Sequence, residues 1–354
     1  MVDLRSAADT ARSGGRVGGA GPVVSAPSSP PSSPARRARR RRLGAGTQRR
    51  AALAFAPTML VSLVFVYVFI GTTVYISLSN WRIGTSRDLT LREPLGSTYA
   101  ELVLEQRFQA GIRNLVVFTV CFLLLSVLGG LIWALLIHHV VAARGLFRTV
   151  FLLPYALSFI VTGVAWRWIF APETGVNQIL EFFGVQDPPG WMTDTTILGA
   201  LNQPTGEDWL KVQLGVPVAM LPIIFAAGWQ LLGFAMAMYL AGLAAIPEEQ
   251  LEAASVDGAS AWQRIRHITL PQLWPATVTC FVLLLHVALK IFDLVVSMSG
   301  SGPGFVTDVP GIYIYNYLAS RYDKASAMSI VLLVLTLCVI VPYLIRGYRK
   351  ERRS

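Results

Sequence analysis

Charged residues are scarce in this chain. Only 14% of its 354 residues are Asp, Glu, Lys or Arg, whereas 54% are hydrophobic. A typical soluble domain has about 25% charged residues, so the composition indicates a membrane protein. Most of the net charge of +10 lies at the two ends of the chain. We therefore expect no nucleic-acid partner, because the basic residues are not spread over a domain.

Cysteine and histidine are also rare, with three and four residues. Cys121, Cys280 and Cys338 lie in apolar runs without a CxxC or His spacing, so we expect them to be buried small hydrophobic residues. His138 and His139 have no carboxylate nearby in the sequence, which argues against a metal site. The motifs GxxxxGK[ST], HExxH and GxSxG do not occur in the sequence. We expect a protein that is not an enzyme and that itself holds no cofactor or metal.

Long apolar runs occur six times, and each reaches the roughly 20 residues that a membrane-spanning helix needs. The sequence predicts an all-α, polytopic membrane protein with six transmembrane helices. The predicted spans are about 51–79, 112–138, 149–170, 216–245, 275–297 and 326–345. Residues 1–50 are rich in Gly, Ala, Ser, Pro and Arg and are predicted to form a disordered basic tail. The six-span domain then covers 51–346, and 347–354 form a second basic tail.

The distribution of Lys and Arg predicts the orientation of the chain. Placing both termini in the cytoplasm puts 20 of the 30 basic residues inside and eight outside. Basic residues favour the cytoplasmic side, so both ends are expected there. The basic run near residues 36–50 could bind anionic lipid or nucleic acid, but an orientation signal beside the first span explains it more simply.

One compact polar segment, residues 247–272, interrupts the apolar runs on the predicted cytoplasmic side. It is expected to form two short helices. Pro247 suits a first helical position, and Gly258 suits the turn between the helices, because only glycine adopts a left-handed conformation freely. Ser260 and Gln263 have the spacing of a capping box. Pro271 and Pro275 are expected to end the second helix before the fifth span.

Several polar side chains lie inside the predicted spans. His286, Lys290, Asp293 and Ser297 would share one face if the fifth span were a continuous helix. Since charge in a membrane is costly, Lys290 and Asp293 are expected either to pair structurally or to line a pathway. In the fourth span, Gln230 and Phe234 share a face. An amide and an aromatic ring suit a sugar, but this pair equally suits plain helix packing.

The polar segment resembles the EAA loop of permease subunits from binding-protein-dependent ABC importers. Its matching positions are Glu252, Ala253, Ala254, Gly258, Ile268, Leu270 and Pro271, with Asp257 directly before the glycine. The flanking stretches "WQLLGFAMAMYLAGLAAIP" and "KIFDLVVSMSGSGP" resemble the carbohydrate (maltose-type) branch of these permeases. Two positions depart from that branch: Ser301 stands where glycine is usual, and Lys290 stands where glutamine is common.

The resemblance implies the ABC type I importer permease fold and a location in the bacterial cytoplasmic membrane. The EAA loop (247–272) would then couple half of a carbohydrate pathway to a separate ATPase dimer, which binds ATP and Mg. A second permease subunit, expected to differ from this chain in sequence, and an extracytoplasmic solute-binding protein would complete the importer. The alternative is an ATP-independent secondary transporter that uses Lys290 and Asp293 as its ion site.

Overall fold

The computed structural model describes residues 34–82, 88–139, 144–202, 204 and 209–351. The chain divides into two units, Met1–Phe65 and Val66–Ser354, and the second contains most of the helices. In chain order the elements are α1 (Pro34–Ser77), α2 (Ser97–Val103), α3 (Gln106–Leu123), η1 (Leu124–Leu128), α4 (Gly129–His139), α5 (Arg144–Leu152), η2 (Pro154–Ala156), α6 (Phe159–Ile169), α7 (Val176–Phe182), β1 (Ile197–Leu198), β2 (Val216–Pro217), α8 (Met220–Ala244), α9 (Glu248–Val256), α10 (Ala261–Arg264), η3 (Ile265–Thr269), α11 (Leu270–Leu289), α12 (Asp293–Met298), η4 (Pro303–Phe305), α13 (Pro310–Tyr317) and α14 (Tyr322–Glu351).

Five helices in the described part are long and apolar enough to cross a membrane, and a sixth span exists if one bent helix pair is counted. The five are Leu53–Ser77, Gln106–His138, Met220–Ala244, Ala261–Leu289 and Tyr322–Tyr343. The bent pair is Gly145–Ala156 with Phe159–Ile169. The predicted all-α, membrane-spanning class is confirmed, and every predicted apolar run corresponds to one of these segments.

The predicted tails differ from the structure. Residues 1–33 and 352–354 lie outside the described residues, but α1 already begins at Pro34 and α14 continues to Glu351. Over 34–50 the structure has a helix where the sequence predicted disorder, and disorder of the tail stays a prediction. The physical reason is composition, because alanine and arginine, which dominate this stretch, both have high helix propensity.

The sequence suggested that the third span is one straight helix, but in the structure it is bent. Its two halves meet at an angle of 96° around Leu157 and Ser158. Pro154 begins the short turn η2, and Ser158 caps α6 by accepting a hydrogen bond from the Val161 N–H at 3.3 Å. Because an N-cap residue has an extended backbone, a second helix starts here in a new direction.

The fifth span is also broken, and its boundaries differ from the prediction. The helix begins at Ala261, passes through the wide π turn η3 and continues to Leu289, so neither Pro271 nor Pro275 ends it. Pro271 lies in the first turn after η3, where the extra residue of a π turn rearranges the backbone hydrogen bonds. The actual end lies at Lys290, and α12 starts three residues later.

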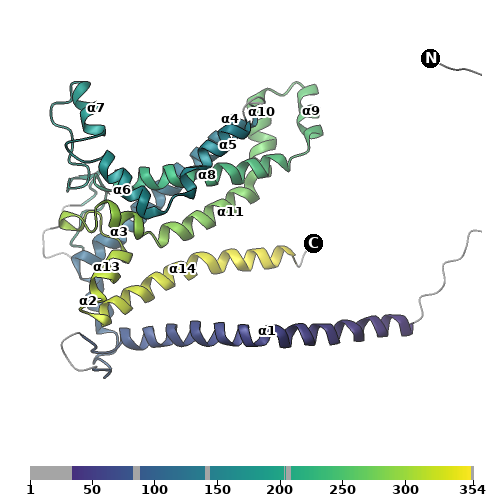
Figure 1. Ribbon diagram of the computed structural model, residues 1–354, viewed down its shortest axis with the longest axis horizontal. Coiled ribbons are helices and arrows are strands. Elements are labelled where there is room, and N and C mark those ends of the chain that lie inside the picture. Colours follow the sequence, from purple (N-terminus) through teal and green to yellow (C-terminus); the bar gives the residue numbers. More distant parts are fainter. Residues whose placement is uncertain (1–33, 83–87, 140–143, 203, 205–208, 352–354) are drawn as a thin grey trace, which may run out of the picture. The chain divides into compact units, whose positions relative to one another are not determined.

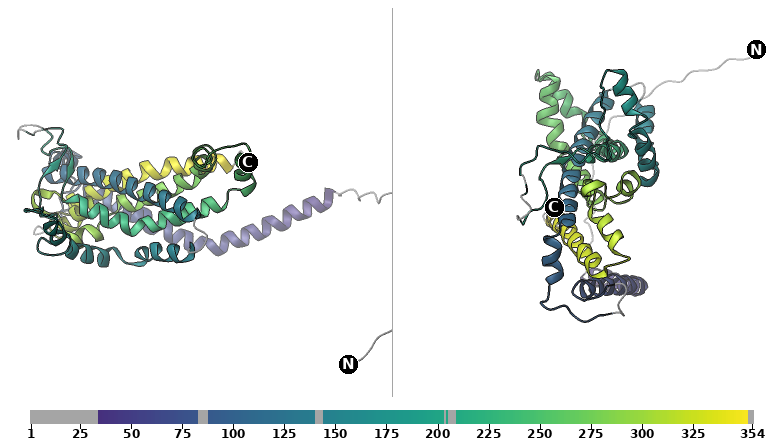
Figure 2. Two further views of the ribbon diagram at one scale, coloured as in Figure 1. Left: turned by 90° about the horizontal axis from the view of Figure 1, so that it is seen from above. Right: turned by 90° about the vertical axis from the view of Figure 1, so that its left-hand side faces the viewer.

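Helix α8 is the centre of the second unit and packs against α3, α4, α5, α6, α11 and α12. Much of α8 is buried, including Ile223, Leu231 and Met236. Figure 1 shows α9 and α10 at one end of α8 and α11, and α2, α13 and the start of α3 at the opposite end. We call these the EAA end and the far end. Figure 2 shows these helices of the second unit from two further sides.

Small residues let neighbouring helices of the second unit approach one another closely. A Cβ atom on Gly233 would lie 1.8 Å from the backbone carbonyl oxygen of Phe151 in α5. In the same way, a Cβ on Gly163 of α6 would lie 1.8 Å from the Ser297 hydroxyl of α12. In membranes, where lipid removes the hydrophobic driving force, such close packing is what holds helices together.

Two groups of polar contacts, each containing an ion pair, connect the helices at the far end. Glu105, directly before α3, accepts hydrogen bonds from Tyr313 at 2.9 Å and Tyr317 at 2.8 Å, and it pairs with Lys324 at 2.5 Å. Arg107 pairs at 2.5 Å with Asp308, whose side chain is completely buried. These contacts join the start of α3 to α13 and α14.

A buried amide completes this arrangement. The Asn114 Nδ2 donates to the backbone carbonyls of Phe305 at 2.9 Å and Asp308 at 2.8 Å. Phe305 has a positive φ of 62°, which is unusual for a residue with a side chain. Asn114 holds the Phe305 carbonyl, and the Arg107 guanidinium lies 5.3 Å from the centroid of the Phe305 ring. The loop before α13 is therefore fixed by contacts with α3.

The Gly233→Ala substitution should destabilise the protein by more than about 2 kcal/mol, because the new methyl group meets backbone rather than a movable side chain. Gly71→Ala is the matched control, since no atom lies within 4 Å of the added methyl group in that helix. Thermal unfolding of the purified chain in detergent measures both variants. Equal unfolding temperatures for the two variants would contradict the close α5–α8 packing.

The far-end group around Glu105 predicts a pH dependence. Burial raises the pKa of Glu105, but hydrogen bonds from Lys324, Tyr317 and Tyr313 outweigh burial and hold the pKa below its usual range. Since the folded pKa lies below the unfolded value of about 4.3, this carboxylate stabilises the fold above that pH and stops doing so as the pH falls through the folded pKa.

The Glu105→Gln variant should therefore be less stable by about 3 kcal/mol at neutral pH, because it leaves Lys324 without its partner. The difference from the wild type should shrink as the pH falls below about 4. Unfolding temperatures measured across this range test the prediction. A difference that stays constant with pH would show that Glu105 is not charged in the fold.

Candidate functional site

The first half of the EAA loop is the helix α9, which ends in a Schellman motif. The N–H of Ala259 donates to the Ala254 carbonyl at 2.9 Å, and the N–H of Gly258 donates to the Ser255 carbonyl at 3.1 Å. Gly258 has a φ of +80°, as the sequence predicted for this turn. Pro247 is the N-cap residue of α9 rather than its first helical residue, a shift of one position from the prediction.

The second half starts with the predicted capping box. The Ser260 N–H donates to the Gln263 Oε1 at 2.7 Å, and the Gln263 N–H donates to the Ser260 hydroxyl at 3.3 Å. This pair begins α10, which continues through η3 into the fifth span. The EAA loop therefore has a defined shape, with two short helices joined by one left-handed residue.

One side of α9 contacts the helix bundle. Leu251 packs on the buried cluster that contains Leu243 and Leu273. Next to it, the Gln272 Nε2 donates to the Gln250 Oε1 at 2.6 Å and joins α9 to α11. These contacts attach the first short helix to the start of the fifth span.

The other side of the EAA loop is open. Val256 is 88% exposed and Trp262 is 64% exposed, although both side chains are apolar. Of the positions that match the EAA pattern, those exposed are Glu252, Ala253, Asp257, Gly258 and Pro271, and those partly buried are Ala254, Ile268 and Leu270. An exposed surface that combines apolar, small and acidic residues is suited to contact with another protein.

Gln230 and Phe234 contact the break in the third span. The Gln230 Nε2 donates to the Leu157 carbonyl at 2.7 Å, and the ring of Phe234 stacks on Tyr155 with centroids 5.3 Å apart. Gln230 is only 2% exposed. The amide therefore satisfies a carbonyl that the break leaves without a helical partner, as a membrane requires. This favours the packing alternative for Gln230 over direct contact with a solute.

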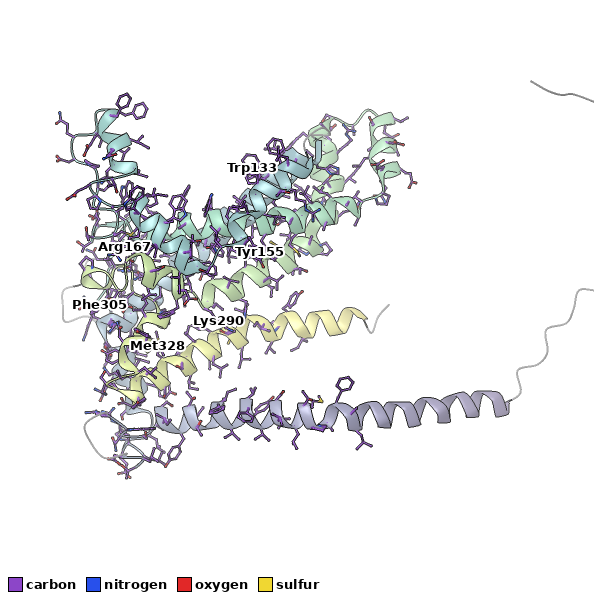
Figure 3. The ribbon with its side chains drawn as sticks, in the orientation of Figure 1. Trp133, Tyr155, Arg167, Lys290, Phe305 and Met328 are labelled. Carbon is purple, nitrogen blue, oxygen red and sulfur yellow. The ribbon has the colours of Figure 1, made fainter. Side chains whose placement is uncertain are left out.

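The predicted polar stripe of the fifth span does not exist as one helical face. The helix ends at Lys290, and Asp293 belongs to the first turn of α12. Both side chains are exposed and they form no ion pair with each other in the described part of the chain. Figure 3 shows Lys290 at the end of α11 away from the EAA end. The prediction of a structural Lys290–Asp293 pair is wrong, because three unwound residues separate helices that the sequence suggested were continuous.

His286 remains inside the fifth span, as expected. It is partly buried, and its Nδ1 atom is buried without a hydrogen-bond partner among the described residues. The hydroxyl of Ser297, the last member of the predicted stripe, donates to backbone carbonyls of α12. No group of three or more metal-ligating side chains occurs within the described ranges.

The sequence reasoning missed both helix breaks and the polar contacts at the far end. The Pro154 and Ser158 pair, typical of a helix start, could have revealed the break in the third span. An aspartate in the first turn of α12 is a weaker signal for the second break. The Glu105–Lys324 and Arg107–Asp308 pairs join residues about 200 positions apart, so no local pattern could have predicted them.

Comparison with known proteins gives the family. Residues 126–353 match the model of the binding-protein-dependent transport system inner membrane component. A probable ABC transporter permease protein of Pyrococcus horikoshii is 34% identical over 307 residues, which cover 85% of this chain and 96% of that protein. A xylose/arabinose import permease protein of Haloferax volcanii is 32% identical, with 83% and 86% covered. A trehalose/maltose transport system permease protein of Thermococcus litoralis is 30% identical, with 84% and 94% covered.

Solved structures agree with this assignment. A chain of a bacterial ABC transporter involved in the import of the acidic polysaccharide alginate superposes with a TM-score of 0.65 and 25% identity, covering 87% of this chain and 99% of that chain. The same fold occurs in a complex of a bacterial alginate transporter with a pentasaccharide-bound periplasmic protein, with a TM-score of 0.63 and 25% identity, covering 83% and 93%.

The chain belongs to the family of binding-protein-dependent transport system inner membrane components. It has the ABC type I importer permease fold and is a transmembrane subunit of an ATP-driven importer rather than an enzyme. This membership also removes the alternative of an ATP-independent secondary transporter, whose proposed ion site depended on a helical face that the structure lacks.

The separation of Lys290 from Asp293 gives a prediction about folding. Lys290→Gln and Asp293→Asn should each leave the yield of folded protein unchanged, because neither removes the partner of a buried charge. Arg107→Gln is the contrasting variant, since it leaves the buried Asp308 without its ion-pair partner and should cost about 3–5 kcal/mol. Size-exclusion profiles of the purified variants measure the yield. A loss in Lys290→Gln that Asp293→Asn restores would contradict the structure.

Proposed function

We propose that this chain forms half of the pathway of a carbohydrate importer and that the EAA loop couples the pathway to a separate cytoplasmic ATPase dimer. The names of the xylose/arabinose and trehalose/maltose relatives support a carbohydrate substrate. In this proposal ATP and Mg bind to the partner ATPase, and this chain holds no cofactor. Both termini and the EAA loop then lie in the cytoplasm, as the distribution of Lys and Arg favours.

The observation that carries the coupling role is the two-sided shape of the EAA loop. Leu251 and Gln250 attach α9 to the bundle, whereas Glu252, Val256 and Trp262 face outward. A partner that moves the exposed side therefore moves the start of the fifth span with it. Glu252 would contact the ATPase, and Gly258 would hold the angle between the two short helices.

The break in the fifth span is the proposed solute contact of this chain. Unwound backbone between two half-helices is where transporters commonly place their substrate sites. Lys290 and Asp293 flank this break, are exposed and are not paired with each other, so both can form charge-assisted hydrogen bonds with sugar hydroxyl groups. His286 would line the same side, whereas Gln230 and Phe234 would act indirectly by fixing the break in the third span.

The full importer would also contain a second permease subunit and an extracytoplasmic solute-binding protein. The solved alginate transporter in complex with a periplasmic protein supports the latter partner.

The exposed surface on the EAA loop predicts that Gly258→Pro strongly weakens ATPase binding, because proline cannot adopt the positive φ of Gly258 and lacks the N–H that donates to Ser255.

Affinity purification of the tagged chain from its native membranes tests this, with partners identified by mass spectrometry. The wild type should retain a P-loop ATPase and a second six-span chain. The amount of ATPase that copurifies with Gly258→Pro should be lower by about tenfold or more. Gly300→Pro is the matched control, because Gly300 also has a positive φ and a donating N–H but lies beyond α12, away from the EAA loop. Undiminished ATPase in Gly258→Pro would refute the coupling role.

A further inference from the structure

A cavity of about 200 Å³ lies between the EAA loop and the helix bundle. Its walls come from the ends of α4 and α8, from α9 and α10, and from η3. Leu135, Leu243 and Leu251 provide apolar surface, and His138, Arg264 and Thr269 provide polar groups. The cavity therefore touches both the short helices of the loop and two membrane spans.

Arg264 is the group in this cavity that most needs a partner. It is partly buried, and it forms no ion pair or side-chain hydrogen bond in the part of the chain that the structure describes. None of the residues that line the cavity is acidic. A guanidinium group offers five fixed donors that match the oxygens of a phosphate or carboxylate. Arg264 also borders a neighbouring open hollow lined by Asp257, but no ion pair joins the two residues, so its guanidinium is available to an anionic ligand.

A second observation comes from Thr269. This residue is only 6% exposed, lines the cavity, and its hydroxyl forms no hydrogen bond with another described residue. Because this hydroxyl is accessible from the cavity and is not enclosed by protein, it can donate a hydrogen bond to a ligand that binds there. Together Arg264 and Thr269 offer donors to the same cavity from successive turns of one helix.

We propose that this cavity binds the phosphate group of an anionic phospholipid. The phosphate would lie against Arg264 and Thr269, and the glycerol portion of the lipid would contact Leu135, Leu243 and Leu251. Basic pockets between spans on the cytoplasmic side are suited to lipid headgroups, because the inner leaflet is rich in anionic lipid. The ligand then bridges the EAA loop and the spans behind it. The choice of an anionic lipid from the inner leaflet rests on the orientation in the proposed function, whereas the anion site itself does not.

Native mass spectrometry of the purified full-length chain tests the site without the ATPase, so a failed coupling role does not affect the outcome. The probe is phosphatidylglycerol, added in increasing amounts to the detergent-solubilised chain. Arg264→Gln should weaken the tightest binding step at least about tenfold, which corresponds to one lost charge-assisted hydrogen-bonding group. Arg264→Lys should weaken it less, because it keeps the charge.

Arg266→Gln is the matched control. It removes the same charge two residues away, but Arg266 is exposed and does not line the cavity. The proposal requires Arg266→Gln to bind like the wild type, and phosphatidylcholine to bind at least about tenfold more weakly than phosphatidylglycerol. Inorganic phosphate added in excess tests a soluble anion as the source: displacement by phosphate together with weak lipid binding would overturn the lipid assignment. Equal effects of Arg264→Gln and Arg266→Gln would overturn the site itself.

Discussion

The close approach of neighbouring helices to α8 is the constraint on which the rest of the fold depends. A side chain does not fit at Gly233, where a Cβ would lie 1.8 Å from the backbone carbonyl oxygen of Phe151, and one at Gly228 would need the Leu125 side chain, 2.3 Å away, to move. Lipid gives helices no hydrophobic reason to associate, so contact over small residues must supply the attraction. Because α8 also carries Gln230, the same helix that forms the packing centre satisfies the broken backbone of the third span.

The position of α8 links the EAA loop to the breaks in the third and fifth spans. At its EAA end, α8 leads through Pro247 into α9, which is attached to α11 by Gln250 and Gln272. At the other end of α11 lies the break at Lys290, and α12 beyond it packs on α6. A movement of the EAA loop therefore has a continuous path of packed helices to both breaks. The charged pairs at the far end instead join α3 to α13 and α14, which makes that end resistant to separation.

Local chemistry could be predicted from the sequence, whereas the helix breaks and the distant contacts could not. The left-handed Gly258 and the Ser260–Gln263 capping box were predictable because each depends on residues within a few positions. The stripe of His286, Lys290 and Asp293 was wrong because helical periodicity assumes an unbroken helix. Pro271 was misinterpreted for a related reason, since a π turn before it lets the helix continue. The proposed role of Arg264 and Thr269 could not be predicted, because the cavity that they line is formed by segments far apart in the sequence.

Because Gln250 and Leu251 join α9 to α11 and its neighbours, we expect the EAA loop and the start of the fifth span to move as one body. The most direct test is to join Gln250→Cys and Gln272→Cys with a short methanethiosulfonate cross-linker, in a chain whose own three cysteines are replaced. The two side chains are already in contact at 2.6 Å, so a fixed link should leave ATP-driven uptake by the assembled importer unchanged. Uptake that stops on cross-linking and returns on reduction would show that α9 and α11 must separate during transport, and would contradict movement as one body.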